Sequence, residues 1–235
     1  MAAAPDIAPF RRSAPFFGAL LLLAIPAFWP TYLFPKQYET DWHVHVHGIA
    51  LFLWALLLIA QPALIRAGKP RIHRKLGKVS YLLAPVIVVS TILLARYRMH
   101  DSVPTFDQLY FLCVQIALMT IFSVAYVQAI RWRRVGGMHA RYMVCTGIAM
   151  IDPILARILY NHTGLDIPWL QMATYLFTDG ILLVLWLRDH RAGNGIRVFP
   201  AMLALCVAME LPTFFLPQTA AWQALVAGFA RLPLP

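Results

Sequence analysis

HVHGIALFLWALLLIAQPALI, residues 45–65, contains no Asp, Glu, Lys or Arg. About 20 consecutive apolar residues in a helix cross a hydrocarbon core of about 30 Å, so we predict a transmembrane helix over residues 43–65. Six other apolar stretches have a similar length, at residues 14–34, 79–95, 109–130, 142–160, 168–187 and 198–216. The sequence therefore predicts an all-α, polytopic membrane bundle of seven transmembrane helices.

The composition agrees with this fold class, since 60% of the 235 residues are apolar and 13% are charged. No linker or low-complexity tract divides the chain, so residues 1–235 are expected to form a single transmembrane domain. Residues 218–230 are too few to cross a bilayer and are expected to form a helix along the outer interface. All three cysteines fall inside predicted spans and are expected to be reduced packing residues: Cys113, Cys145 and Cys206.

The net charge of +10 is distributed unevenly along the chain. Fifteen of the 20 Lys and Arg residues fall on the side of the bundle where the amino terminus lies, and four fall on the other side. By the positive-inside rule, the amino terminus is cytoplasmic. The cations on that side would contact the headgroups of the lipid bilayer, which explains the basic net charge. The asymmetry therefore argues against nucleic acid as a partner.

Three histidines, His43, His45 and His47, alternate just before the second span. Thr40 or Asp41 is a good N-cap for a helix, and in a helix His43 and His47 share a face while His45 points away. This arrangement favours a metal site or an axial haem ligand, and the alternative is that the imidazoles simply suit the headgroup layer. Further ligands would come from residues predicted on the outer side, namely His45, His100, Asp101, His162 and Glu210.

Ionisable residues at membrane depth are costly and need a partner or a function. Asp152 and Arg157 lie in the fifth predicted span, Asp179 in the sixth and Glu210 in the seventh. We expect these groups, with His47, to line one cavity that opens to the outside, and Glu210 is a plausible partner for Arg157. The alternative is that they are interhelical pairs that hold the bundle together.

Two basic connections are predicted to be loops, at residues 66–78 and 131–141, and they carry His73 and His139. The two histidines lie in "RIHRKLGKVSYLLAPVIVV" (71–89) and "GGMHARYMVCTGIAMIDPILARIL" (136–159). Either the two imidazoles face each other and hold a haem or metal, or they dock the connections onto carbonyl groups at helix ends. These phrases, with residues 45–65, resemble an uncharacterised family of bacterial seven-helix membrane proteins, which implies a bacterial inner membrane and no known activity. The resemblance covers residues 43–160 and rests on His47, Gln61, His73, Arg74, Leu76, Gly77, His139, Arg141, Met143 and Arg157.

More distantly, the chain resembles membrane proteins linked to haem-copper oxidase maturation and the b-type cytochromes. We therefore expect haem b or a transition metal (copper, iron or zinc) as cofactor, in redox chemistry or metalloprotein maturation. Alternatives are a small-solute or proton transporter, a structural subunit with a partner in a membrane complex, and a zinc hydrolase. The candidate metal ligands are His43, His45 and His47, the candidate cofactor-binding residues are His47, Arg157, Glu210, His73 and His139, and the remaining intramembrane polar residues are Asp152 and Asp179.

Overall fold

A computed structural model of the chain describes residues 8–34, 41–99, 104–194 and 197–234. All regular elements in these ranges are helices, which confirms the predicted fold class. Seven helical segments are long and apolar enough to cross a membrane: Phe10–Leu33, Trp42–Arg66, Pro70–Tyr97, Phe106–Arg131, Gly136–Thr163, Ile167–Arg191 and Val198–Gln218. The chain is therefore a polytopic membrane protein.

Several spans consist of more than one helix. The α-helices are α1 (Ala14–Phe28), α2 (Trp42–Arg66), α3 (Pro70–Gly77), α4 (Ser80–Tyr97), α5 (Phe106–Arg131), α6 (Gly136–Ile148), α7 (Ile151–Thr163), α8 (Ile167–Arg191), α9 (Val198–Glu210) and α10 (Ala220–Ala230). Short helical turns of other types are η1 (Ala8–Arg12), η2 (Trp29–Leu33), η3 (Leu211–Phe214) and η4 (Leu216–Gln218).

Proline explains two of the breaks. α6 ends at Ile148 and α7 begins at Ile151, just before Pro153, because proline lacks the amide hydrogen that would bond to the carbonyl of Ala149. In the same way α9 gives way to 3-10 turns at Pro212, where the sequence predicts a stop or a kink. Both breaks expose backbone carbonyls inside the bundle, next to the polar residues described below.

The two basic connections are more helical than the sequence predicts. Residues 66–78 were expected to be a loop, but Pro70–Gly77 forms α3, with proline in the first turn and Arg74 and Lys75 in the last. Arg, Lys and Leu are good helix formers, and cations stabilise a helix carboxyl end. Likewise α6 begins at Gly136, so His73 and His139 both lie on helices.

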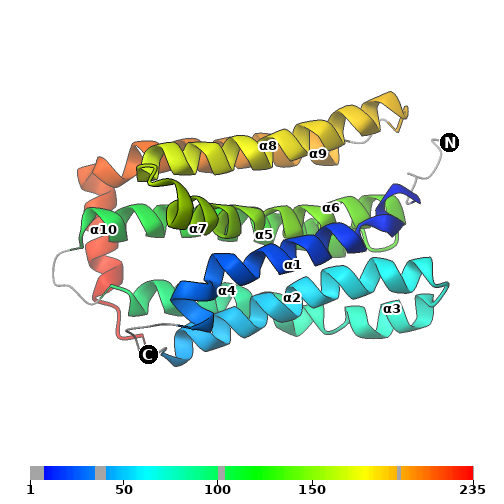
Figure 1. Ribbon diagram of the computed structural model, residues 1–235, viewed down its shortest axis with the longest axis horizontal. Coiled ribbons are helices and arrows are strands. Elements are labelled where there is room, and N and C mark those ends of the chain that lie inside the picture. Colours follow the sequence, from blue (N-terminus) through cyan, green and yellow to red (C-terminus); the bar gives the residue numbers. More distant parts are fainter. Residues whose placement is uncertain (1–7, 35–40, 100–103, 195–196, 235) are drawn as a thin grey trace.

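The long helices run nearly parallel, and α10 crosses one end of the bundle (Figure 1). We call the other end, which carries the turns α2–α3, α5–α6 and α8–α9, the basic end, and the end with α10 the opposite end. α10 is held there by a hydrogen bond from Trp222 Nε1 to the carbonyl of Leu109 (3.0 Å). Its position along a membrane interface stays a prediction.

The core lies around α5, which packs against α4, α6 and α9. On one side Trp54 is fully buried, packs against Phe122 and donates its indole hydrogen to Thr146 Oγ1 (3.2 Å). On the other side an apolar cluster joins α5, α6, α8 and α9 around Leu182 and Phe199. Large apolar side chains elsewhere point outward, as expected for helices in contact with lipid.

Candidate functional site

The histidine triplet lies in the first turn of α2, as the sequence predicts. Asp41 is the N-cap, and its carboxylate accepts a hydrogen bond from the backbone amide of His43 (2.9 Å), which lowers the pKa of Asp41 below its usual value. The His43 ring also contacts the Asp41 carboxylate through Nδ1 and stacks between Trp42 and Tyr97. His43 is thus well ordered by neighbours on α2 and α4.

The other two imidazoles of the triplet have different neighbours. His45 Nδ1 contacts the hydroxyl of Tyr32 (3.1 Å), and His47 Nδ1 contacts Ser90 Oγ (3.2 Å) on α4. In the described part of the chain the triplet does not form a group of three close ligand atoms. A metal held by His43, His45 and His47 stays a prediction. Of the other ligands considered, His162 is exposed at the end of α7, and His100 and Asp101 lie outside the described residues.

Asp152 lies at the start of α7, is 2% exposed, and has its partners on α8. Its Oδ1 accepts hydrogen bonds from Thr174 Oγ1 (2.5 Å) and Gln171 Nε2 (2.7 Å). Sequence reasoning missed both partners. The sequence does contain a signal for them, because three polar residues recur at helical spacing in an otherwise apolar helix: Gln171, Thr174 and Thr178.

Arg157 does not pair with Glu210, contrary to expectation. The described residues contain no ion pair between them. The guanidinium of Arg157 instead donates to the carbonyl of Pro153 (3.0 Å) and lies over the ring of Phe28, 4.5 Å from its centroid. It lies within electrostatic range of Asp152 and His47. Phe28 belongs to α1, and a hydropathy pattern does not contain the position of α1 against α7, so the sequence could not identify this neighbour.

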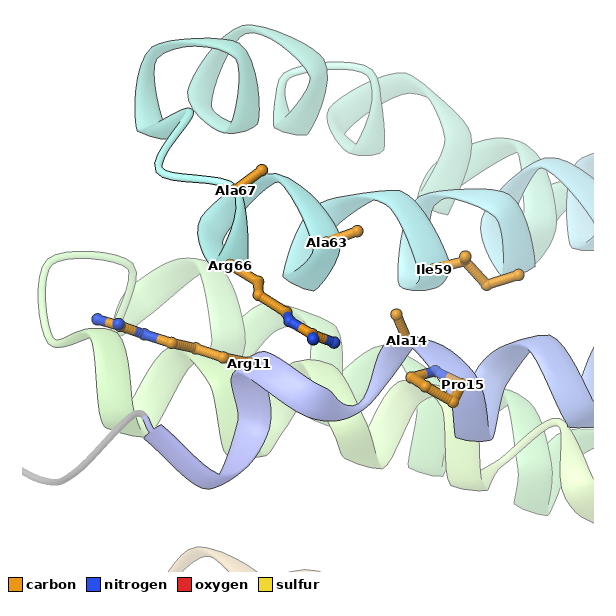
Figure 2. Close-up of a pocket in the computed structure, with 7 residues that line it drawn as sticks. All are labelled: Arg11, Ala14, Pro15, Ile59, Ala63, Arg66 and Ala67. Atoms are coloured by element: carbon orange, nitrogen blue, oxygen red, sulfur yellow. The ribbon is translucent and has the colours of Figure 1, made fainter.

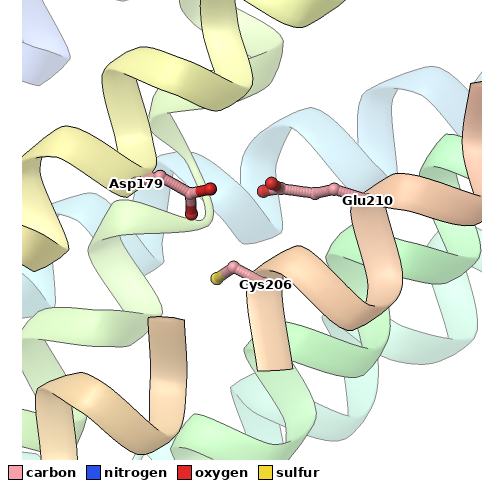
Figure 3. A group of neighbouring side chains, drawn as sticks. All are labelled: Asp179, Cys206 and Glu210. Carbon is pink, nitrogen blue, oxygen red and sulfur yellow. The ribbon is translucent and has the colours of Figure 1, made fainter. Parts of the chain in front are cut away.

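Glu210 meets Asp179 and Cys206 instead (Figure 3). One ligand atom from each of the three residues lies within 4.8 Å of those of the other two. Glu210 and Cys206 are 4% and 3% exposed, and Asp179 Oδ1 is buried without a hydrogen-bond partner in the described chain. Sequence reasoning treated Cys206 as a packing residue, although Cys206 and Glu210, four residues apart, share one face of α9.

Among the described residues, Asp179, Cys206 and Glu210 are the only three His, Cys, Asp or Glu side chains gathered in this way. We call them the acidic thiol cluster. The two carboxyl groups and the thiol face one another between α8 and α9 (Figure 3). Two carboxylates this close in a low dielectric are not both ionised unless a cation lies between them. The cluster can therefore hold either a proton or a metal ion.

His73 and His139 come together at the basic end, with ring centroids 6.4 Å apart and planes at 90°. His139 Nδ1 donates to the carbonyl of Ala129 (2.8 Å), near the end of α5. His73 lies against Gln61, near the end of α2, with Nδ1 3.4 Å from its carbonyl oxygen. These contacts are those expected if the histidines dock helices, while a cofactor between the two rings stays a prediction.

Arg141 forms a buried ion pair that the sequence did not indicate. It was counted with the cations of the basic connections, but it is fully buried on α6. Its Nε and Nη2 donate to the two carboxylate oxygens of Asp189 on α8, at 2.6 and 2.7 Å. Nη1 donates to the carbonyl of Gly137 (2.8 Å), and the guanidinium lies 4.8 Å from the centre of the Phe10 ring.

The polar groups therefore occupy two separate levels of the bundle. Asp152 and the acidic thiol cluster lie toward the opposite end, and the pair of Arg141 and Asp189 lies near the basic end. Between them is an apolar cluster that includes Leu182, Phe199 and Met202. A pocket that is discussed below lies at the basic end, away from the acidic thiol cluster.

Comparison of the chain with models of protein families, with curated proteins and with solved structures finds no match. The resemblance described for residues 43–160 therefore identifies no family. Seven long apolar helices place the chain among polytopic membrane proteins.

Proposed function

We propose that this integral membrane protein binds a transition-metal ion inside its helical bundle, with Asp179, Cys206 and Glu210 as ligands. One observation carries the proposal: a thiol and two carboxyl groups from two helices converge within 4.8 Å. Zinc takes sulfur at about 2.3 Å and carboxylate oxygen at about 2.1 Å, so small side-chain movements bring all three atoms into contact with one ion.

The buried oxygen of Asp179 supports this fit. A buried carboxylate oxygen without a hydrogen bond is costly, and Asp179 Oδ1 has no such partner among the described residues. A metal ion would satisfy this oxygen and offset the charge of the Glu210 carboxylate. Three protein ligands leave a coordination position for water or a small molecule, as in zinc sites that exchange ligands.

The surroundings favour exchange of the ion with one side of the membrane. Polar groups continue from the acidic thiol cluster toward the opposite end, where Tyr175 donates to Thr213 (3.4 Å) and Asp152 binds Thr174. Toward the basic end the path is closed by apolar side chains. Such a site, with polar groups on one side only, suits redox chemistry or the maturation of a metalloprotein better than transport across the membrane.

Metal analysis of the purified full-length protein in mild detergent tests this proposal. We expect about one zinc, iron or copper ion per chain after exposure to trace metals, and an affinity at least tenfold lower in each of Asp179→Asn, Cys206→Ser and Glu210→Gln. Cys113→Ser is the matched control, because Cys113 is equally buried but lies in a different cluster. A folded protein that binds no metal, or variants that bind as well as the control, would overturn the proposal.

A second candidate is proton transfer, which the burial of the ionisable groups Asp152 and Glu210 inside the bundle favours. In that case the carboxyl groups of Asp179 and Glu210 would share a proton instead of a metal ion. Proton flux into vesicles that Asp152→Asn abolishes and Cys206→Ser leaves unchanged would identify this function, because a thiol is needed only by the metal site.

A further inference from the structure

A pocket of about 520 Å³ opens at the basic end, between the start of α1 and the end of α2 (Figure 2). Its walls are formed by Ala14 and Pro15 on α1 and by Ile59 and Ala63 on α2. The small alanine side chains leave space between the two helices. The mouth carries two cationic side chains, described next, so the pocket is apolar along its length and charged at one end.

Arg11 and Arg66 come from different helices at the same end of this gap; the Arg66 side chain reaches between the helices, and the exposed Arg11 side chain extends away from the gap (Figure 2). Guanidinium groups stay protonated at any physiological pH, so two positive charges stand at the mouth. No acidic residue lines the pocket, and the ion pairs found among the described residues involve other cations. An anion at the mouth would therefore offset charges that the described protein leaves uncompensated.

The apolar walls indicate what kind of anion fits. Ile59 precedes Arg66 by seven residues, which places it about 10 Å deeper along α2. A phosphate at the arginines would thus lie at headgroup level, with a hydrocarbon chain running past Ala63 and Ile59 into the bilayer. Free phosphate would use the charges and leave the apolar walls uncovered, whereas a phospholipid matches both.

We propose that this pocket is a binding site for an anionic phospholipid, whose phosphate group is held by Arg66 and, after a rotation of its exposed side chain toward the gap, by Arg11. The arginine fork can bind two phosphate oxygens at once, and basic pockets between transmembrane helices suit lipid headgroups in this way. The lipid would bridge α1 and α2 and fill the gap that their small residues leave. This inference is independent of the metal site, which lies between other helices.

The test measures lipid bound to the full-length protein after reconstitution in nanodiscs of mixed phosphatidylglycerol and phosphatidylcholine, followed by release into detergent and native mass spectrometry. We expect phosphatidylglycerol to be retained in preference to phosphatidylcholine. Each of Arg11→Gln and Arg66→Gln should lower that retention by about fivefold, the effect of one cation near an anionic leaflet. Arg191→Gln is the control, because Arg191 is exposed at the same end of the bundle but outside the pocket.

A second variant separates lipid binding from loss of charge or of fold. Ala63→Phe fills the pocket and keeps both arginines, so it should reduce phosphatidylglycerol retention while the protein melts at an unchanged temperature. Equal retention of the two lipids by the unmodified protein, or unchanged retention in both Arg66→Gln and Ala63→Phe, would overturn the proposal. So would complete displacement of phosphatidylglycerol by added inorganic phosphate, since the ligand would then be a soluble anion.

Discussion

Removing one partner of the buried ion pair between Arg141 and Asp189 should destabilise the bundle strongly. Asp189→Leu removes the carboxylate that the Arg141 guanidinium binds, at a position with no solvent exposure. Breaking a buried pair in this way costs about 3–5 kcal/mol, whereas an exposed pair contributes below about 1 kcal/mol. Because the two hydrogen bonds measure 2.6 and 2.7 Å and both groups are buried, we expect a value in the upper range.

Replacing both partners should cost far less than the sum of the two single changes. In Arg141→Met with Asp189→Leu, no buried charge remains and similar volumes are kept, so the loss should be about 1 kcal/mol or less, apart from the contacts of Arg141 with Gly137 and Phe10. The single and double variants then form a thermodynamic cycle with a coupling of at least about 5 kcal/mol, which is above the usual range for contacting residues because each single change leaves a buried charge unpaired.

Unfolding by sodium dodecyl sulfate in mixed micelles, followed by tryptophan fluorescence, measures these free energies. Arg191→Gln serves as the exposed control and should change stability by less than about 0.5 kcal/mol. If Asp189→Leu costs under about 1 kcal/mol, or if the double variant loses the full sum, the pair of Arg141 and Asp189 is not the buried ion pair described here.

Two further changes test local features of the fold. Gly147→Ala should destabilise the protein by about 1–3 kcal/mol in the same unfolding assay, because the new methyl carbon would lie 2.3 Å from the Phe17 ring. Gly18→Ala is the control and should leave stability unchanged, because the space around Gly18 is open. Equal effects of the two changes would refute the close approach of α1 and α6. The ionised Asp41 caps α2 through the His43 amide, which lowers the pKa of Asp41, so its stabilisation is present above the unfolded value of 3.8 and is lost as the pH falls below it. The stability difference from Asp41→Ala should therefore shrink as the pH falls below 3.8, and a pH-independent difference would contradict the cap.

Local signals predicted much of this structure. The span over α2 follows from its apolar length, its start follows from Asp41, and the break before α7 follows from Pro153. Each of these three features depends on groups within a few residues of one another, so the local sequence is enough to predict it. The expectation of loops at residues 66–78 and 131–141 was wrong in large part, because clustered cations mark an interface without specifying whether the backbone there is helical.

The partners of the buried polar residues could not be predicted from the sequence. Asp152, Asp179 and Glu210 were recognised as buried ionisable groups, but Glu210 was assigned to Arg157, and Cys206 was taken for a packing residue. Which side chains meet depends on the rotation of each helix about its axis and on which helices are neighbours, and a hydropathy pattern contains neither quantity.

The sequence by itself therefore determined the class of protein, the seven spans, and most helix ends. The free energy of moving a residue into lipid and the free energy of capping a helix both depend only on residues close together in the chain. Only the tertiary structure decided that Cys206 faces two carboxyl groups, that Arg141 is buried against Asp189, and that Arg11 and Arg66 share a pocket. These contacts join residues that are distant in the chain, and they form only when packing fixes the position of one helix against another.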